Sequence, residues 1–202
     1  MNLSNITEIA FGTNILKIEI PEFLKKGGIC LFNTAEESLY QIAMTTQRLK
    51  LKNGFVTGNT DDVKALIAGA RKIMEKKANK GKQFVMVVDS LQCLDDGKYS
   101  SGVKTSGTAI RCLEEITNFC KETGACAVVI NQVNKQGKMA GSNKLKHMVD
   151  AHMHLSVEQK EQDLIGCRVL ETQKNRFGGC GHIFFLHMGK IGFKTVAKVS
   201  AS

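Results

Sequence analysis

Five consecutive apolar residues, Phe84-Val85-Met86-Val87-Val88, are followed directly by Asp89 and Ser90. A short run that is rich in β-branched residues predicts a strand buried on both faces, as in a parallel sheet. An Asp at the carboxyl end of such a strand lies where open α/β sheets bind ligands. The alternative is that Asp89 only caps the following turn. The run therefore predicts an α/β fold and makes Asp89 a candidate binding residue.

Strand and helix patterns alternate through the first two-thirds of the chain, and strand patterns dominate the last third. Strands are expected at 29–32, 55–59, 84–88, 125–130, 151–157, 165–172, 182–188 and 191–196. Helical spacing of apolar residues is found in 39–50, 60–79 and 109–123, and Gly124 is expected to end the last helix. This order predicts a mostly parallel sheet flanked by helices, with an antiparallel extension at the C-terminal edge.

The composition is that of one globular domain. The 202 residues are 43% hydrophobic and 23% charged, and the net charge of +9 favours a polyanionic partner. No apolar run reaches the length of a membrane span, and the N-terminus does not resemble a signal peptide. We therefore expect an intracellular, cytoplasmic protein without membrane contact. The seven cysteines form no CxxC pair and are interpreted as reduced core residues.

The N-terminal segment gives the weakest pattern. Residues 14–20 alternate like a strand, although a short amphipathic helix also fits, and Pro21 would then open a short helix.

Farther on, Thr34 and Glu37 form a capping-box pattern, so a helix is expected to start there. The adjacent Glu36 and Glu37 are either helix-start acids favoured by the helix dipole or catalytic carboxylates.

Three polar stretches complete the pattern. The outer face of the helix at 60–79 is rich in lysine, which we interpret as a solvated surface. Residues 95–108 are rich in Gly, Ser and Lys, and we expect a mobile loop there. Residues 133–146 carry several lysines and no acid, and the tail after 196 is expected to fray.

Five short blocks follow one another in a familiar order. They are Glu36-Glu37-Ser38, Val88-Asp89-Ser90-Leu91-Gln92, Asn131-Gln132-Val133-Asn134-Lys135, His147-Met148-Val149-Asp150 and Lys174-Asn175-Arg176-Phe177-Gly178. Together they resemble the ATPase core of the RadA (Sms) family of RecA-like DNA-repair and branch-migration proteins, and the last block is close to a family signature. The resemblance covers roughly residues 29–195. It implies a single RecA-like domain over 1–202, with a divergent N-terminal segment (1–28), a RadA-like core (29–196) and a tail (197–202).

The resemblance implies an ATP and Mg²⁺ site. In RecA-like proteins, the Glu after the second core strand polarises the attacking water, and this task falls on Glu37 or Glu36. We prefer Glu37 because it directly precedes Ser38, as in the family. Asp89 resembles the Walker B acid that binds Mg²⁺, and Ser90 lies beside it as a second cofactor-binding candidate.

The resemblance also implies roles for one amide and two cations. Gln132 follows the strand after which RecA-like proteins place a sensor of the γ-phosphate. Lys174 and Arg176 resemble the cationic pair that reaches the nucleotide of a neighbouring subunit and stabilises phosphate charge in trans. Such a pair requires a homo-oligomer, either a ring or a filament.

DNA, single-stranded or branched, is the partner that the resemblance implies. Residues 133–146 match the segment that faces DNA in this class, and their cations suit sequence-independent phosphate contacts. The candidate cations are Lys135, Lys138, Lys144 and Lys146. Residues 95–108 match the second DNA-facing loop less well, with Tyr99 as the stacking candidate.

One departure from the family concerns the phosphate loop. No segment matches Gly-x-x-x-x-Gly-Lys-[Ser/Thr], in which backbone amides and one lysine hold the phosphates. The segment expected in its place, 7–14, has one glycine, no lysine, and Glu8, whose charge would repel phosphate. The chain is thus a pseudo-ATPase, or its phosphate loop is lost or supplied by another chain, or an altered loop binds nucleotide.

Three functions remain open at this point. The first is a RadA-like DNA-binding protein of recombination or repair with weak or lost ATP hydrolysis. The second is an interaction module of RecA-like fold that docks onto a partner protein. The third is an active DNA-dependent ATPase with an unorthodox phosphate loop.

Overall fold

The computed structural model describes residues 6–10, 23–48, 54–99, 102–132, 142–190 and 192–200. These residues form one sheet with the strand order β3-β2-β4-β5-β1-β6-β7-β8-β9. The strands are β1 (Ile6–Ala10), β2 (Ile29–Thr34), β3 (Val56–Gly58), β4 (Phe84–Asp89), β5 (Cys126–Ile130), β6 (Ala151–Val157), β7 (Arg168–Asn175), β8 (Ile183–Gly189) and β9 (Gly192–Val199). The helices are α2 (Leu39–Arg48), α3 (Val63–Glu75), α4 (Ser106–Thr123) and α5 (Ser142–Met148).

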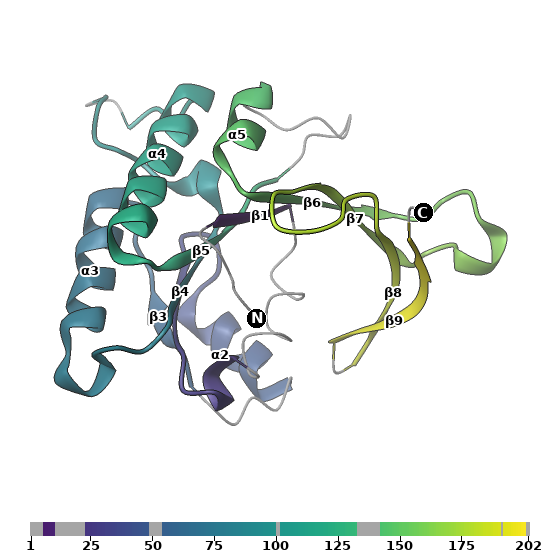
Figure 1. Cartoon of the computed structure of the whole chain (residues 1–202), viewed down its shortest axis with the longest axis horizontal. Coiled ribbons are helices and arrows are strands. Elements are labelled where there is room, and N and C mark those ends of the chain that lie inside the picture. The colour runs from purple at the N-terminus through teal and green to yellow at the C-terminus, as the bar shows by residue number, and fades with distance from the viewer. Residues whose placement is uncertain are drawn as a thin grey trace.

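The sheet has two parts, which meet at β6 (Figure 1). The strands from β3 to β6 in the spatial order are paired in parallel, and those from β6 to β9 are antiparallel. Parallel neighbours need crossover connections, which the helices provide, whereas antiparallel neighbours can be joined by short turns. The structure confirms the predicted mostly parallel sheet with an antiparallel extension at the C-terminal edge.

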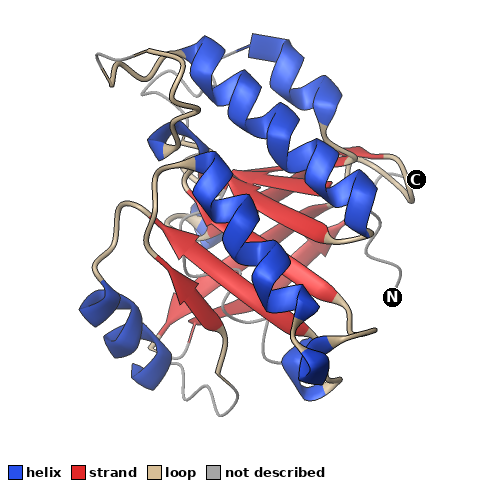
Figure 2. Cartoon of the chain, turned by 90° about the vertical axis from the view of Figure 1, so that its left-hand side faces the viewer, coloured by secondary structure: helices blue, strands red, loops and turns tan. Residues whose placement is uncertain are grey.

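Helices cover both faces of the parallel part, and Figure 2 shows the helices of one face in front of the strands. Side chains of α3, α4 and α5 belong to one apolar cluster, and Ile42 of α2 belongs to a second cluster on the opposite face. The strands β8 and β9 extend away from these helices (Figure 1). Within the described part of the chain, no helix has the length and apolarity needed to span a membrane.

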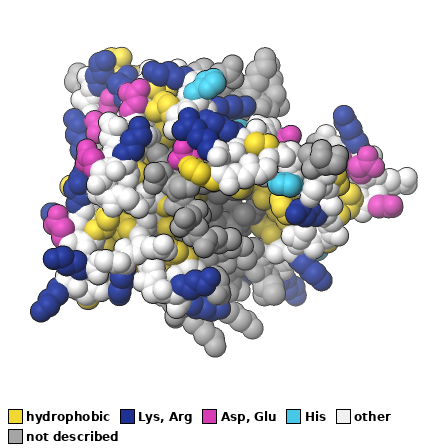
Figure 3. Space-filling view, in the orientation of Figure 1, with side chains coloured by type: hydrophobic (Ala, Val, Ile, Leu, Met, Phe, Trp, Pro, Cys, Tyr) yellow, Lys and Arg dark blue, Asp and Glu magenta, His cyan; other side chains and the backbone are white. Residues whose placement is uncertain are grey.

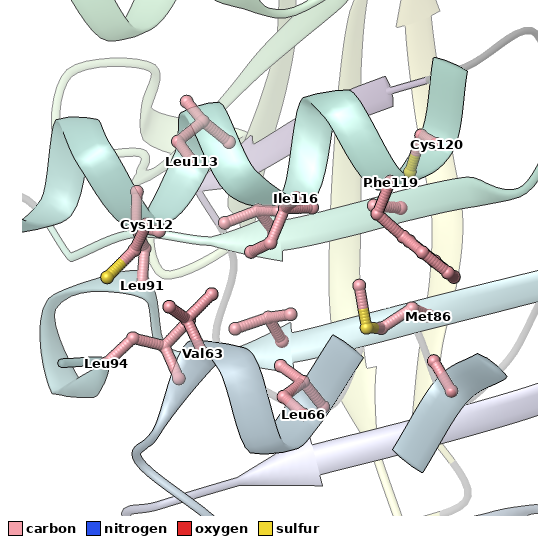
Figure 4. Close-up of a cluster of buried hydrophobic side chains, with 14 of the residues drawn as sticks. Val63, Leu66, Met86, Leu91, Leu94, Cys112, Leu113, Ile116, Phe119 and Cys120 are labelled. Atoms are coloured by element: carbon pink, nitrogen blue, oxygen red, sulfur yellow. The ribbon is translucent and has the colours of Figure 1, made fainter. Parts of the chain in front are cut away.

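The strand β4 is buried on both faces, as its apolar run predicts. Phe84, Met86 and Val88 belong to the cluster beneath α3 and α4, whereas Val85 and Val87 belong to the opposite cluster. Figure 4 shows the first cluster, in which α4 and α3 side chains converge on the Met86 side of the sheet. Because helices cover both sides, the strand has no polar alternation.

The helix α2 begins later than predicted. Ser38, not Thr34, caps it, because Ser38 Oγ accepts a bond from the Gln41 amide at 3.3 Å, and Gln41 Oε1 accepts from the Ser38 amide at 2.8 Å. The Thr34 hydroxyl instead accepts from the amides of Glu36 and Glu37 at 3.2 and 3.0 Å. The predicted capping box is therefore a tight turn that leads from β2 toward α2.

The helix α4 begins earlier than predicted, at Ser106. Thr105 and Thr108 form a capping box in which each side chain bonds the backbone amide of the other. Gly124, with φ of 70°, ends the helix as predicted, since glycine adopts the left-handed conformation without strain. The predicted helix at 60–79 is confirmed as α3, capped by Asp62, followed by a 3-10 turn at Lys77–Asn79.

Three further differences from the sequence patterns concern β1, α5 and β9. The strand β1 was not predicted, because Thr7 and Glu8 interrupt its short apolar pattern. Part of the expected polar loop is the helix α5, and the expected frayed tail is wrong, since β9 pairs with β8 up to Val199. The patterns at 14–20 and at Pro21 lie outside the described residues.

All seven cysteines are free thiols. Cys30, Cys112, Cys120 and Cys126 are buried, which agrees with their interpretation as core residues. The interpretation is wrong for Cys93 and Cys167, which are partly exposed, and for Cys180, which is exposed. Burial raises the pKa of the Cys112 and Cys120 thiols to about 12, so both are neutral and unreactive at ordinary pH.

Candidate functional site

The carboxyl ends of β2, β4 and β5 lie side by side. Asp89 at the end of β4 is level with Thr34 on one side and with Ile130 on the other. The residues that follow these three strand ends therefore meet at one edge of the sheet. In an open α/β sheet, this carboxyl edge is the place where ligands bind.

Glu36 is the centre of the polar cluster at this edge. Its carboxylate accepts hydrogen bonds from the Ser90 hydroxyl, from Cys93 Sγ at 3.0 Å, and from Gln132 Nε2 at 3.0 Å to Oε2 and 3.2 Å to Oε1. The three donors come from the segments after β4 and β5, far from Glu36 in sequence. Three of the predicted site residues, Glu36, Ser90 and Gln132, are thus brought into direct contact.

The turn after β2 aims Glu36 at this cluster. The Thr34 hydroxyl holds the amides of Glu36 and Glu37, and the Ala35 amide donates to the Asp89 carbonyl at 3.2 Å. Of the two neighbouring acids, Glu36 has the carboxylate that bonds Ser90 and Gln132. The preference for Glu37 rested on its position before Ser38, as in the family, and it stays a prediction, while the contacts with Ser90 and Gln132 are those of Glu36.

Asp89 is buried at the end of the central strand, with 5% of its surface exposed, and Ser90 is 1% exposed. Among the described residues, no group of three His, Cys, Asp or Glu side chains could hold a metal ion. Mg²⁺ commonly binds one or two carboxylates and takes its other ligands from phosphate and water oxygens. Asp89 therefore fits a magnesium ion that arrives with a nucleotide, and does not fit an all-protein metal site.

The position of β1 changes the register of the missing phosphate loop. In P-loop proteins this loop follows a strand directly and opens a helix. Because β1 ends at Ala10, the eight residues that follow it are 11–18, with the sequence Phe-Gly-Thr-Asn-Ile-Leu-Lys-Ile. The expected register at 7–14 is wrong, since Glu8 lies within β1. Counted along the sequence from residue 11, Phe11 and Leu16 stand at the two glycine positions, Lys17 at the lysine position and Ile18 at the Ser or Thr position. These residues lie outside the described part of the chain.

Lys174 and Arg176 lie away from the carboxylate cluster. They are at the end of β7, where Asn175 pairs with Ala151, the first residue of β6, and β5, β1 and β6 separate β7 from β4. Lys174 Nζ donates to the carbonyls of Lys146, His147 and Val149 at 2.8, 3.3 and 2.7 Å. Lys174 therefore holds the carboxyl end of α5, as a cation at a helix C-terminus does.

Arg176 has a different environment from Lys174. It pairs with Asp150 at 3.0 Å, and 56% of its side chain is exposed. With Phe177, it lines a pocket of about 550 Å³ that is closed on the other side by Glu114, Thr117 and Lys121 of α4. Within one chain, neither cation of the pair is near Glu36 or Asp89.

The candidate DNA-binding lysines divide into two pairs. Lys144 and Lys146 are on the helix α5, not on a loop, and Lys144 Nζ is 3.4 Å from Glu114 of α4. Lys135 and Lys138 lie outside the described residues. Tyr99 is half-exposed at 44%, and the Arg111 guanidinium lies 5.4 Å from its ring centre.

The segment after β4, within 95–108, makes contacts with the rest of the chain that its Gly-, Ser- and Lys-rich composition does not predict. Asp96 forms an ion pair with Arg111, and Lys104 Nζ bonds Asp61 at 2.9 Å. The hydrogen bond from Arg111 lowers the pKa of Asp96 to about 2. The prediction of a mobile loop overlooked these contacts, because they join residues that are separated by 15 and 43 positions.

Two site features had little or no signal in the sequence. Ser38 and Gln41 match the S-x-x-Q capping pattern, which could have placed the start of α2 correctly. Cys93 gave no such signal, because only the fold brings its thiol to Glu36. Burial raises the pKa of the Cys93 thiol, and the neighbouring Glu36 acts in the same direction.

Comparison with curated proteins gives a consistent result. The chain is 31% identical to the DNA repair protein RadA of Rickettsia conorii over 192 residues, which are 95% of this chain and 41% of that protein. It is 30% identical to RadA of Rickettsia bellii over 175 residues, 85% of this chain and 36% of that protein. RadA of Aquifex aeolicus is 28% identical over 194 residues, 96% of this chain and 41% of that protein. No protein-family model matches the chain.

Solved structures agree at the level of the fold. One ATPase domain has a TM-score of 0.79 and 12% identity, covering 97% of this chain and 86% of that one. A DnaB-like replicative helicase has a TM-score of 0.75 and 11% identity, covering 95% of this chain and 57% of that one. The chain spans about two fifths of the length of the curated relatives it matches. It is a RadA-like protein in sequence, with the fold of a RecA-like ATPase core.

Proposed function

We propose that this chain is a RadA-like DNA-binding protein that acts inside the cell in DNA repair or recombination, with weak or absent ATP hydrolysis. The observation that carries the proposal is the Glu36 cluster at the carboxyl edge, in a chain whose sequence matches RadA proteins over most of its length. A buried Asp89 next to this cluster is what a nucleotide with Mg²⁺ requires.

In this proposal each residue of the cluster has a defined role. Asp89 and Ser90 hold the Mg²⁺ that accompanies ATP, and the ion neutralises phosphate charge when it is bound. Glu36 orients the attacking water, and Gln132, which donates to the Glu36 carboxylate, senses the γ-phosphate. Lys174 donates to three backbone carbonyls of its own chain, whereas the Arg176 side chain remains 56% exposed despite its ion pair with Asp150. Arg176 is therefore the cation assigned to a neighbouring nucleotide.

Weak hydrolysis is proposed because the phosphate loop is chemically incomplete. In the corrected register, glycine is missing beside Lys17, so a leucine side chain replaces the bare backbone that normally approaches the phosphates. Ile18 cannot supply the hydroxyl that Ser or Thr gives to Mg²⁺. A lysine at the expected position of the eight-residue pattern supports nucleotide binding more than it supports ATP hydrolysis.

The DNA-binding part of the proposal rests on charge. Lys135 and Lys138 follow β5 on a segment without acids, and Lys144 and Lys146 lie on the following helix. Such cations contact phosphates without reading sequence, and the affinity falls as salt rises.

The first test is equilibrium binding of a fluorescent ATP analogue with Mg²⁺, comparing the wild type with Asp89→Ala. We expect measurable binding that Asp89→Ala weakens by at least tenfold, and ATP turnover well below once per minute with or without DNA. Glu75→Ala on the outer surface of α3 is the matched control. Equal binding by wild type and Asp89→Ala would remove the proposed nucleotide site.

The active DNA-dependent ATPase is one alternative, and the lysine at position 17 of the sequence supports it. Its signature is DNA-stimulated hydrolysis that both Lys17→Ala and Glu36→Gln abolish. The other alternative, a docking module, is supported by the pocket beside Phe177, a residue that is 61% exposed. Its signature is a protein partner that is retained after nuclease treatment and lost with Phe177→Ala.

A further inference from the structure

A second basic surface lies at the opposite end of the molecule from α5. It consists of lysines at the end of α3 and in the turn that leads to β4, and we call it the α3 lysine patch: Lys72, Lys76, Lys77, Lys80 and Lys82. All five are exposed. Figure 3 shows Lys and Arg side chains gathered at the lower left, over the end of α3 in the same orientation as Figure 1.

The patch has almost no neutralising charge. Glu75 is the only acid between positions 72 and 82, and none of the five lysines forms an ion pair with the described residues. Arg71 on the same helix shows the contrast, because it pairs with Glu122 of α4 and stacks on Phe119 at 5.3 Å. A cation beside the patch is thus used for packing, while the patch itself is left to solvent.

The backbone beneath the patch is fixed. Asn79 Nδ2 donates to the Ile73 carbonyl at 2.8 Å, and the Asn79 amide donates to the Lys76 carbonyl at 2.7 Å. The amide of Lys82 in turn donates to the Asn79 carbonyl at 3.1 Å. Ile73 packs against the apolar cluster beneath α3 and α4. The lysines therefore stand on an ordered turn rather than on a flexible tail.

Helix stabilisation alone does not account for this concentration of charge. Cations in the last turn of a helix interact favourably with its dipole, but the effect falls off within that turn. Lys80 and Lys82 lie beyond both α3 and the following 3-10 turn. Clustered like charges also repel one another, and a polyanion removes this cost.

We infer that the α3 lysine patch is a second, sequence-independent contact surface for the phosphate backbone of DNA. It lies at the amino ends of β2 and β4, since Ile29 pairs with Phe84 there, and the Glu36 cluster lies at their carboxyl ends. Six residues of strand separate the two ends by roughly 20 Å. This inference rests on the proposed function, and it adds a contact outside the segments assigned to DNA above.

The test is a salt titration with a fluorescein-labelled mixed-sequence single strand, read by anisotropy. The variant Lys76→Gln/Lys77→Gln/Lys80→Gln is compared with a control of equal charge loss on the antiparallel extension, Lys160→Gln/Lys190→Gln/Lys194→Gln. The slope of log affinity against log salt is expected to fall by about 2 in the patch variant, since each phosphate contact contributes about 0.7 for single strands. The control is expected to keep the wild-type slope within about 0.5.

Further variants and outcomes make the result decisive. Lys76→Arg/Lys77→Arg/Lys80→Arg preserves the charge and is expected to preserve the slope, which excludes a folding effect of the substitutions. Equal reductions of the slope in the patch and control variants, or no reduction in either, would contradict the proposed DNA contact of the patch without contradicting DNA binding by the chain. If the wild type fails to bind DNA at low salt, the proposed function itself is wrong, and the inference fails with it.

Discussion

At the scale of single residues, the fold decides which of two similar side chains joins the polar cluster at the carboxyl edge. Glu36 and Glu37 are adjacent acids that no local pattern separates, yet the Glu36 carboxylate is the one that accepts hydrogen bonds from Ser90 and Gln132 in the turn held by Thr34. The sequence predicted that an acid belongs at this place. It could not predict the direction of each side chain, because direction follows from the turn geometry.

His152 of β6 carries a pH-dependence prediction at this scale. It is 1% exposed, and burial lowers its pKa from 6.5 to about 4, with the charges of Lys146 and His154 acting in the same direction and Glu171 opposing them. As the pH falls, His152 is therefore protonated in the unfolded chain at a higher pH than in the folded chain. The stability that depends on neutral His152 is complete above pH 6.5 and is lost as the pH falls toward 4.

The measurement is the unfolding free energy in urea at pH 7, 5.5 and 4.5. A loss on the order of 2 kcal/mol is expected for the wild type over this interval. His152→Gln should show a flatter profile, whereas His187→Gln at an exposed position should follow the wild type. The Asp96 pair does not interfere, since a pKa of about 2 places its loss of stability below this window. Parallel profiles for His152→Gln and wild type would contradict the assignment.

At the scale of elements, local patterns predicted most helices and strands, because hydrophobic periodicity survives in a single segment. The exceptions have specific causes. β1 has two polar residues among five, and α5 has only seven residues with little apolar periodicity. Both are stabilised by neighbours in space: β1 by pairing with β5 and β6, and α5 by the Lys174 ammonium on its last carbonyls.

Lys174 and Arg176 are predicted to behave differently although they are neighbours in one motif. Lys174→Ala leaves three carbonyls without their charged donor, which costs roughly 2 kcal/mol and lowers the melting temperature by about 4–8 °C. Arg176→Ala removes an exposed ion pair and is expected to change the melting temperature by about 1 °C or less. Differential scanning fluorimetry of both variants tests this, and equal shifts would refute the distinction.

At the scale of the whole molecule, the two halves of the candidate catalytic machinery are too far apart to meet. The Glu36 cluster is at the carboxyl edge of β2, β4 and β5, and Arg176 follows β7 beyond three intervening strands. If both act on one nucleotide, two copies of the chain must contribute. The geometry of one chain therefore makes the proposed homo-oligomer a requirement of the proposed chemistry.

Assembly is tested by sedimentation velocity with an ATP analogue, Mg²⁺ and DNA. The wild type is expected to form a species larger than a monomer, and Arg176→Ala is expected to weaken this assembly while remaining folded. Lys198→Ala, on the distant strand β9, is the control for loss of a surface cation. A wild type that stays monomeric under all these conditions would argue for the docking module instead.

The sequence by itself determined the α/β architecture, the buried central strand and the carboxyl-edge location of Asp89. These follow from periodicity and from the general geometry of parallel sheets, so they need no knowledge of distant contacts. Only the tertiary structure decided that Glu36 bonds Ser90 and Gln132, that Ile6–Ala10 form a strand between β5 and β6, and that Lys174 holds α5. Each of these depends on which remote segments become neighbours, and a linear pattern does not contain that information.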